Sequence, residues 1–366
     1  MTVDNETSRL IVQRFESNSA AAIYKIPLQA FPNLWGNAYL VLLESHELGE
    51  LRVLIDTGSG SAESNRHLES GLRAVSDQEG RSISLENLTH ILVTHGHIDH
   101  FGGLSYIRPR TQAKLGVHEL DLRNLTHYEE RIAIVARRLD EYLLEAGVPN
   151  ERRAELLALY QSTKRLYHSV PVDFTYEASG MRLGPFEMLH VPGHCAGHVV
   201  IRLHDVLFSG DHVLDQISPH QSPEHLTLST GLDHYLKSLE AVESWAQGIR
   251  LTLGGHKGPV ADLPSRLKDI RRLHAERLSR VLEMLAEPHT IVEVSHALFG
   301  ELEGYNVLLA IEEAGAHIEY LYQRGCLEIH NLKEIQHSEQ PVAIRYQSLP
   351  GASRAGIVTL LTRTKP

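Results

Sequence analysis

The sequence predicts an α/β protein with a helical insertion and a largely helical C-terminal region. Two observations carry this prediction. Short apolar runs that are typical of strands recur between Asn37 and His256, and several of them end at a glycine followed by a polar residue. Helical spacing of apolar residues dominates 119–169 and returns from Pro264 onward.

The expected elements follow in chain order. NAYLVLLES and LRVLIDTG predict two strands joined by the turn-like HELGE, and LTHILVTH and AKLGVH predict two more. The insertion then predicts a helix with one apolar stripe (Ile132, Val135, Leu139, Tyr142, Leu143 and Ala146) and a second helix over 151–167. Strands return at FEMLHVPGH, VVIRLHDVLFSGDH and IRLTLGGH. After the helix from Pro264, further helices are expected around 291–299 and 304–323, and the tail PVAIRYQSLPGASRAGIVTLLTRT alternates like a hairpin.

The stretch ILVTHGHIDHFGG, Ile91–Gly103, places four residues that can bind metal directly after a predicted strand: His95, His97, Asp99 and His100. With 24 histidines among 366 residues, a chance cluster is one alternative. The spacing favours the other, because imidazoles at i and i+2 point the same way on extended backbone. Asp99 and His100 would then begin a short helix.

Three further candidates follow strand patterns that end in glycine. His194 lies in VPGHCAGH, Asp211 in LFSGDH and His256 in LTLGGH. With the first four, they make seven candidate ligands. One zinc ion needs only three or four. Seven ligands with one shared carboxylate suit two metal ions about 3.5–4 Å apart.

The ordered set THxHxDH, GH, GD and GH resembles the metallo-β-lactamase-fold hydrolases over approximately residues 22–262, and LIDTG at Leu54–Gly58 matches another of their motifs. The resemblance implies an αββα sandwich. It also implies that one metal binds to His95, His97 and His194, that the other binds to Asp99, His100 and His256, and that Asp211 bridges them. Asp56 and His198 would support ligands rather than bind metal. The pattern is closer to the glyoxalase II and nuclease branches than to antibiotic-hydrolysing lactamases.

The implied chemistry is hydrolysis by hydroxide shared between two divalent ions, with Asp99 as the catalytic residue that ligates metal and orients the hydroxide. Zinc is the first expectation for the ions, and N and O ligands also accept iron or manganese. Cys195 lies beside His194, but a small buried thiol is the better interpretation than a nucleophile.

We expect a catalytic domain over 1–263, containing the insertion 119–169, and a C-terminal domain over 264–366. GELEGYNVLLAIEEAGAHIEYLYQRG gives the latter a resemblance to an appended winged helix. The insertion is expected to act either as a lid over the site or as ordinary helix packing or a dimer contact. Its Tyr128 and Tyr142, together with His220, are candidate substrate-binding residues.

Composition limits the partners. The formal net charge of −11 gives no general attraction for nucleic acid or anionic membrane, and the segment 304–322 carries Glu312, Glu313 and Glu319 without Lys or Arg. No signal pattern opens the chain, no run approaches a membrane span, and two cysteines far apart suit a reduced, cytoplasmic protein. We therefore expect a small-molecule substrate, with a homo-oligomer allowed.

Two enzymatic functions compete on this evidence. The first is hydrolysis of an ester-type substrate, with a thioester favoured. The second is cleavage of RNA or another phosphodiester, because relatives of this architecture cut RNA. A non-catalytic binding protein is the weakest interpretation, because every expected ligand is present.

Overall fold

The computed structural model describes residues 11–165 and 167–351, which form two compact units. The first unit comprises 1–131, 164–219 and 238–266, and the second comprises 132–163, 220–237 and 267–366. The last change of unit along the chain falls between residues 266 and 267. The helices expected in the insertion, however, group with the C-terminal part of the chain rather than with the sheets.

The first unit contains a seven-stranded sheet in the order β1 to β7. Strands β1 to β4 are antiparallel neighbours, and β4 to β7 run parallel. Their bounds are β1 Gln13–Glu16, β2 Ala22–Phe31, β3 Leu34–Ser45, β4 Gly49–Ile55, β5 His90–Leu92, β6 Lys114–Val117 and β7 Phe174–Thr175.

A second sheet of five strands has the order β12-β11-β10-β9-β8. It is antiparallel except for the parallel pair β11 and β12. The strands are β8 Arg182–Leu183, β9 Phe186–His190, β10 Val199–Leu203, β11 Val206–Gly210 and β12 Leu251–Gly254.

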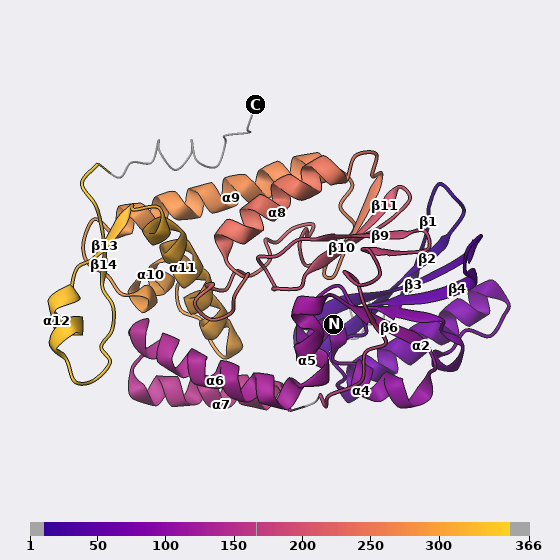
Figure 1. Cartoon of the computed structure of the whole chain (residues 1–366), viewed down its shortest axis with the longest axis horizontal. Coiled ribbons are helices and arrows are strands. Elements are labelled where there is room, and N and C mark those ends of the chain that lie inside the picture. The colour runs from indigo at the N-terminus through magenta and orange to yellow at the C-terminus, as the bar shows by residue number, and fades with distance from the viewer. Residues whose placement is uncertain (1–10, 166, 352–366) are drawn as a thin grey trace, which may run out of the picture. The chain divides into compact units, whose positions relative to one another are not determined.

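The main core lies between these two sheets. Val41 and Val53 from the first sheet and Ile201 and Phe208 from the second belong to one buried cluster. Alternate residues of each strand face this core, as a half-buried strand requires. The first unit is thus the α/β sandwich that the sequence resemblance implied, with its helices outside the sheets (Figure 1).

Helix α2, Ala62–Glu79, packs on β2 and was not among the expected elements. Its side chains Leu68, Leu72 and Val75 are buried, and the Ser61 hydroxyl caps its first turn. The other helices that lie between strands β5 and β7 in the chain include three short ones: α3 Ile98–Phe101, α4 Leu104–Ile107 and α5 Leu122–Thr126. Helix α3 is the turn expected at Asp99 and His100.

The second unit is built mainly from helices. Helices α7 Asn150–Thr163, α10 Ile291–Phe299 and α11 Tyr305–Gln323 belong to it wholly, and helices α6 Tyr128–Glu145, α8 Leu232–Trp245 and α9 Leu263–Met284 belong to it in part. The short α12, Leu332–His337, lies between β13, Leu327–Ile329, and β14, Tyr346–Ser348. Strand β14 pairs antiparallel with β13, and the end of the expected tail hairpin lies outside the described residues.

Within this unit, the apolar stripe of α6 is buried by the chain itself. Leu139, Tyr142, Leu143 and Ala146 are all buried, and the Tyr142 hydroxyl donates to the carbonyl of Ile311 on α11. This is the ordinary packing that was one of the interpretations of the insertion. Among the described residues, no helix has both the length and the apolar character needed to span a membrane.

Candidate metal centre

The seven candidate ligands all lie just beyond strand ends of the first unit. His95 and His97 follow β5, and Asp99 and His100 lie on the short helix α3 that comes next. From the other sheet, the residues that follow β9, β11 and β12 are His194, Asp211 and His256. Each sheet therefore contributes loops to one cluster, as expected for a site held on a rigid scaffold.

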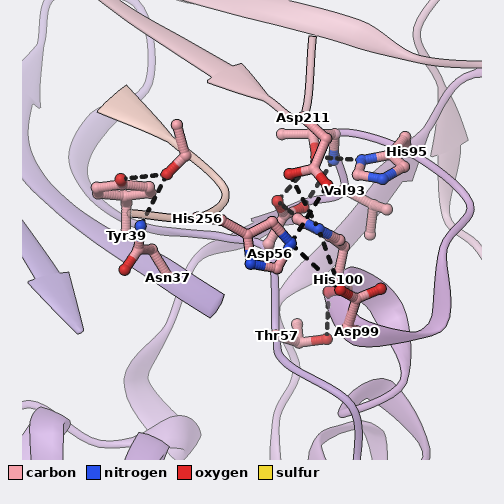
Figure 2. Close-up of polar contacts among 12 residues, drawn as sticks. Asn37, Tyr39, Asp56, Thr57, Val93, His95, Asp99, His100, Asp211 and His256 are labelled. Carbon is pink, nitrogen blue, oxygen red and sulfur yellow. Dashed lines mark hydrogen bonds and ion pairs between the residues drawn. The ribbon is translucent and has the colours of Figure 1, made fainter. Parts of the chain in front are cut away.

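Asp211 lies at the centre of this cluster (Figure 2). Its Oδ2 atom is 3.2 Å from His256 Nε2 and 3.7 Å from His194 Nε2, and its Oδ1 atom is 3.4 Å from His100 Nε2. Asp99 Oδ2 lies 3.3 Å from His256 Nε2 and 3.8 Å from His100 Nε2. These separations match donor atoms that share one small cation.

The donor atoms fall into overlapping groups that can each hold a metal ion. One group is His95, His97 and His194, and another is Asp99, His100 and His256. A third joins Asp211 to His95 and His100. Within each group, the donor atoms lie within 4.8 Å of one another. The structure thus brings all seven residues together in one cluster.

Hydrogen bonds fix the tautomers of three of these imidazoles. His100 Nδ1 donates to Asp56 Oδ2 at 2.8 Å, and His256 Nδ1 donates to the Trp35 carbonyl at 2.6 Å. His95 Nδ1 donates to the Thr94 hydroxyl at 3.0 Å, since that hydroxyl gives its own proton to Asp56. In the neutral form of each ring, the unprotonated nitrogen is therefore Nε2, which faces the cluster and is the atom that can bind metal.

Several inward atoms have no hydrogen-bond partner among the described residues. These buried atoms include His95 Nε2, His100 Nε2 and Asp211 Oδ1. Buried polar atoms are normally satisfied, so a set of them facing one point suggests a bound ion. Gly255 contributes by its lack of a side chain, because a Cβ there would collide with Asp211 Oδ1 and His100. The residues present therefore fit a metal site.

The charges are unevenly divided over the cluster. Burial disfavours a protonated His256, but Asp211 and Asp99 outweigh it and raise the pKa of His256 to about 10. The pKa of His100 also rises well above its usual value against the effect of burial, because Asp211, Asp99 and Asp56 surround it. His95 and His97 lack this compensation, and burial with neighbouring imidazoles lowers their pKa values far below the ordinary one.

Asp56 and His198 both contact candidate ligands of the cluster. The Asp56 carboxylate accepts from the Thr94 backbone N–H, the Thr94 hydroxyl and His100 Nδ1, at 2.8, 2.7 and 2.8 Å. Its backbone has φ of 59°, an uncommon conformation for a residue other than glycine. His198 Nε2 accepts from the backbone N–H of Asp211 at 3.1 Å, and its ring stacks on His95. Both side chains therefore orient candidate ligands.

Residues on β3 that the sequence did not single out hold the His256 loop. Tyr39 donates its hydroxyl to the Gly254 carbonyl at 2.6 Å, and Asn37 Nδ2 donates to the same carbonyl at 2.9 Å (Figure 2). The backbone N–H of Asn37 also donates to the Gly255 carbonyl at 2.7 Å. These contacts join residues more than 200 positions apart, so no local sequence signal marks them.

The three candidate substrate-binding residues have other contacts. Tyr128 is 5% exposed and packs edge-on against Phe101 and Tyr167 in the first unit. Tyr142 is 3% exposed and is occupied by α11, as described above. His220 belongs to the second unit, where its Nε2 lies 2.9 Å from Glu312 Oε2. Burial leaves neither tyrosine a surface for substrate, so neither has a part in the function proposed below.

The acidic residues of α11 also have internal partners. Glu313 Oε2 accepts from the backbone N–H of Gln221 at 2.7 Å, and Glu319 accepts from the backbone N–H groups of Glu224 and His225 at 2.8 and 3.1 Å. These carboxylates therefore hold the segment 221–225 against α11. Part of the negative charge seen in the sequence therefore serves to hold the fold together.

Comparison with known proteins gives one consistent result. Residues 35–279 match the family model of the metallo-beta-lactamase superfamily. The probable metallo-hydrolase YqjP of Bacillus subtilis is 24% identical over 291 residues, which cover 75% of this chain and 85% of that protein. The beta-lactamase-like protein 2 homolog of Drosophila melanogaster is 30% identical over 195 residues, covering 53% of this chain and 51% of that protein.

Solved structures extend the likeness beyond the sheets. The metallo-beta-lactamase family protein TTHA1429 from Thermus thermophilus has a TM-score of 0.69 and 26% identity, covering 89% of this chain and 98% of its own. A beta-lactamase domain protein from Burkholderia ambifaria has the same fold, with a TM-score of 0.67, 22% identity and coverage of 92% and 94%. The share of this chain that each structure covers is larger than the segment matched by the family model.

Proposed function

Since the chain belongs to the metallo-beta-lactamase superfamily, whose members are metal-dependent hydrolases, we propose that it uses two divalent metal ions to hydrolyse an ester-type carbonyl substrate, a thioester in particular. The observation that carries the proposal is the convergence of six donor side chains around Asp211, with the Nε2 atoms of His100 and His256 facing it and their Nδ1 atoms bonded outward.

The residues have separate roles in this proposal. His95, His97 and His194 would hold one ion, Asp99, His100 and His256 the other, and Asp211 would be shared. Zinc is the first choice, and iron or manganese suits the same donors. When bound, two such ions lower the pKa of water and polarise a carbonyl oxygen, which supplies a nucleophile and an electrophile near neutral pH.

Asp99 is the candidate catalytic residue of the chain. Its side chain is 15% exposed, against 2% for His100 and 10% for Asp211, so it is the carboxylate of the cluster most open to an incoming molecule. Burial favours its protonated form, but His100 and His256 outweigh burial and lower the pKa of Asp99. It therefore stays ionised near neutral pH, and its oxygens can accept hydrogen bonds from an attacking water and orient it.

Cys195 does not compete for the role of nucleophile. Its thiol is 6% exposed and lies 3.3 Å from both carboxylate oxygens of Asp121. Burial and the Asp121 charge raise the pKa of this thiol well above its usual value. A thiolate is the reactive form, and this environment opposes it.

Charge supports an acyl substrate over a polyanion. The net charge of −11 gives the chain no general attraction for a polyanion, and α11 has no Lys or Arg with which to contact phosphate. A small neutral or weakly charged acyl compound meets no such obstacle. Nucleic acid is accordingly not among the proposed substrates.

The test uses purified protein with its metal content measured. We expect about two ions per chain and hydrolysis of acyl thioesters, in a panel that also holds oxygen esters, lactones, a phosphodiester and RNA. Activity should disappear with a chelator and return with metal. Thioester turnover should survive added salt, because it does not rest on counterion release. RNA cleavage that resists salt and far exceeds any ester turnover would overturn the substrate class, and a protein that binds no metal would overturn the mechanism.

A further inference from the structure

Asp121 is a buried carboxylate that no part of the proposed mechanism uses. It is fully buried and lies just after β6, at the end of a short 3₁₀ turn, Glu119–Asp121. A buried charge in a protein normally has compensating partners. Here the partners come from the two loops that carry three of the candidate ligands.

The first loop is Thr94–His97. Asp121 Oδ2 accepts from the backbone N–H of Gly96 at 2.7 Å, and Gly96 stands between His95 and His97. The approach is close, since a Cβ on Gly96 would lie 2.8 Å from Asp121 Cγ. The position of this carboxylate therefore fixes the backbone between two donor imidazoles.

The second loop is His194–Gly197. The thiol of Cys195, the residue directly after His194, donates to Asp121, and the backbone N–H of Gly197 does the same. A Cβ on Gly197 would lie 2.6 Å from Asp121 Cγ. The same carboxylate thus touches both loops from one side and leaves no room for a side chain on either glycine.

Support for Asp121 comes from α5 and α6. Asn124 Nδ2 donates to Asp121 Oδ1 at 3.2 Å, and Arg131 Nε donates to Asn124 Oδ1 at 3.1 Å. All the groups around the carboxylate are donors, so an acceptor-only side chain is required at this position.

We propose that Asp121 is a positioning residue that sets the spacing of His95 and His97 against His194, and so determines the metal affinity of the three-histidine half of the centre. The inference rests on the proposed function only in requiring that the cluster binds metal. It leaves the half formed by Asp99, His100 and His256 unaffected, since those residues have Asp56 and the Trp35 carbonyl as their partners.

Asp121→Asn is the matched substitution, because the shape is kept and one acceptor becomes a donor facing other donors. Supports of this kind typically change metal affinity about 10–100-fold. The variant is placed in two backgrounds. In His256→Ala the three-histidine half is intact, and Asp121→Asn should weaken its binding of Co²⁺ about 10–100-fold. In His97→Ala the other half is intact, and the same change should alter Co²⁺ affinity less than about threefold.

Co²⁺ titration against a competing chelator gives the affinities, and the visible spectrum of the bound Co²⁺ reports its coordination independently of catalysis. Asp173→Asn is the control, because Asp173 also accepts a backbone N–H, that of Leu115, but lies beside the start of β6 and pairs with Arg108. It should leave both affinities unchanged. Equal weakening of both halves by Asp121→Asn, or of neither, would overturn the inference.

A second pair of variants keeps the inference testable if Asp121→Asn fails to fold. Cys195→Ala removes one donor to Asp121 and should weaken the three-histidine half a few-fold, whereas Cys195→Ser keeps a donor and should restore it. Equal Co²⁺ affinities for these two variants would count against the inference. If the unmodified protein binds no metal at all, the proposed function fails first, so the two failures are distinguishable.

Discussion

Each unit of the protein buries a cluster of histidines and carboxylates, and the two clusters differ in how their protons are arranged. In the first unit, His95, His100 and His256 use Nδ1 for an outward hydrogen bond and direct Nε2 toward Asp211. The second unit has His274 on α9, with Glu313 and His317 on α11, and their donor atoms also lie within 4.8 Å of one another.

In the second cluster, two of the imidazoles are joined by a hydrogen bond. His317 Nδ1 donates to the Glu313 backbone carbonyl at 2.7 Å, so its Nε2 is an acceptor, and His274 Nδ1 lies 3.2 Å from that Nε2 and donates to it. The Glu313 carboxylate is paired with Arg277 at 2.8 Å and accepts from the Gln221 N–H. The Nε2 lone pair of His317 and the charge of Glu313 are therefore both occupied, whereas His274 Nε2 has no hydrogen-bond partner in the described part of the chain.

Closeness of histidines is therefore a weak criterion for a metal site. What distinguishes the first cluster is that the carboxylates of Asp99 and Asp211 face the Nε2 atoms of its rings, whereas the carboxylate of Glu313 is paired with Arg277. Substitutions in either cluster can test this contrast, and those with the strongest effects come first.

Removing the central carboxylate of the first cluster should have the largest effect. Asp211→Asn should lower ester hydrolysis and metal content by more than about 100-fold, beyond the range for supports of ligands. The matched change in the second cluster, Glu313→Gln, should leave the metal content unchanged, because that carboxylate serves Arg277 and Gln221. Elemental analysis with kinetics checks both, and metal loss in Glu313→Gln would erase the contrast.

Asp56→Asn tests the outward hydrogen bond of His100. An amide at this position can present its NH₂ to the imidazole and so favour the wrong tautomer, and metal affinity should fall about 10–100-fold. Competition with a chelator measures the loss. Undiminished affinity would mean that the tautomer of His100 does not depend on Asp56.

His317→Leu should destabilise the protein without affecting metal binding. It leaves the His274 Nδ1–H and the Glu313 carbonyl without their partner in a buried place, which costs about 1–3 kcal/mol of unfolding free energy. Urea denaturation of the metal-free protein measures this. The exposed His46→Leu is the control and should stay within about 0.5 kcal/mol of the unmodified protein.

The second cluster should also weaken the protein in acid. Burial, with His317 and Arg277, lowers the pKa of His274 well below its ordinary 6.5. The unfolded chain then binds a proton below pH about 6.5 that the folded one does not, so this residue's contribution to stability is full at neutral pH and is lost as the pH falls. His274→Gln cannot titrate, and its metal-free form should lose less stability between pH 7 and 5 than the unmodified protein. Equal losses in the two proteins would contradict the assignment.

Cys195→Ala should have the smallest effect on catalysis. The loss of one hydrogen bond to Asp121 corresponds to a factor of at most about ten in turnover. Full loss of turnover with the metal content unchanged would instead indicate a covalent role for the thiol, and alkylation of the native enzyme at Cys195 would then be detectable by mass spectrometry.

The sequence was informative wherever the relevant signal is local. Gly-terminated strands and the THxHxDH spacing were enough to name His95 through His100, and the motifs around His194, Asp211 and His256 have the same character. Helical spacing likewise located α6, α9 and α11. Helix α2 was missed, although Leu68, Leu72 and Val75 carry a readable stripe.

The remainder depends on contacts between distant segments. The spacing of the α6 stripe predicts that Tyr142 is buried against another element, but only the fold shows that this element is α11. Nothing near Asp121 in the sequence marks it as a partner of Gly96 and Cys195. In the sequence, Glu313 and Glu319 contributed to the acidic character of the segment 304–322. In the fold, their carboxylates accept hydrogen bonds from backbone N–H groups.

The division of the ligands between the two sheets has a consequence for the lifetime of the folded state. Loops after the first sheet carry His95, His97, Asp99 and His100, and loops after the second carry His194, Asp211 and His256. An ion bound in either half would be coordinated by loops of both sheets. The two sheets could then separate only after the ion had dissociated. Metal-loaded protein should therefore resist proteolysis for longer than metal-free protein, and the gain should grow with free metal concentration.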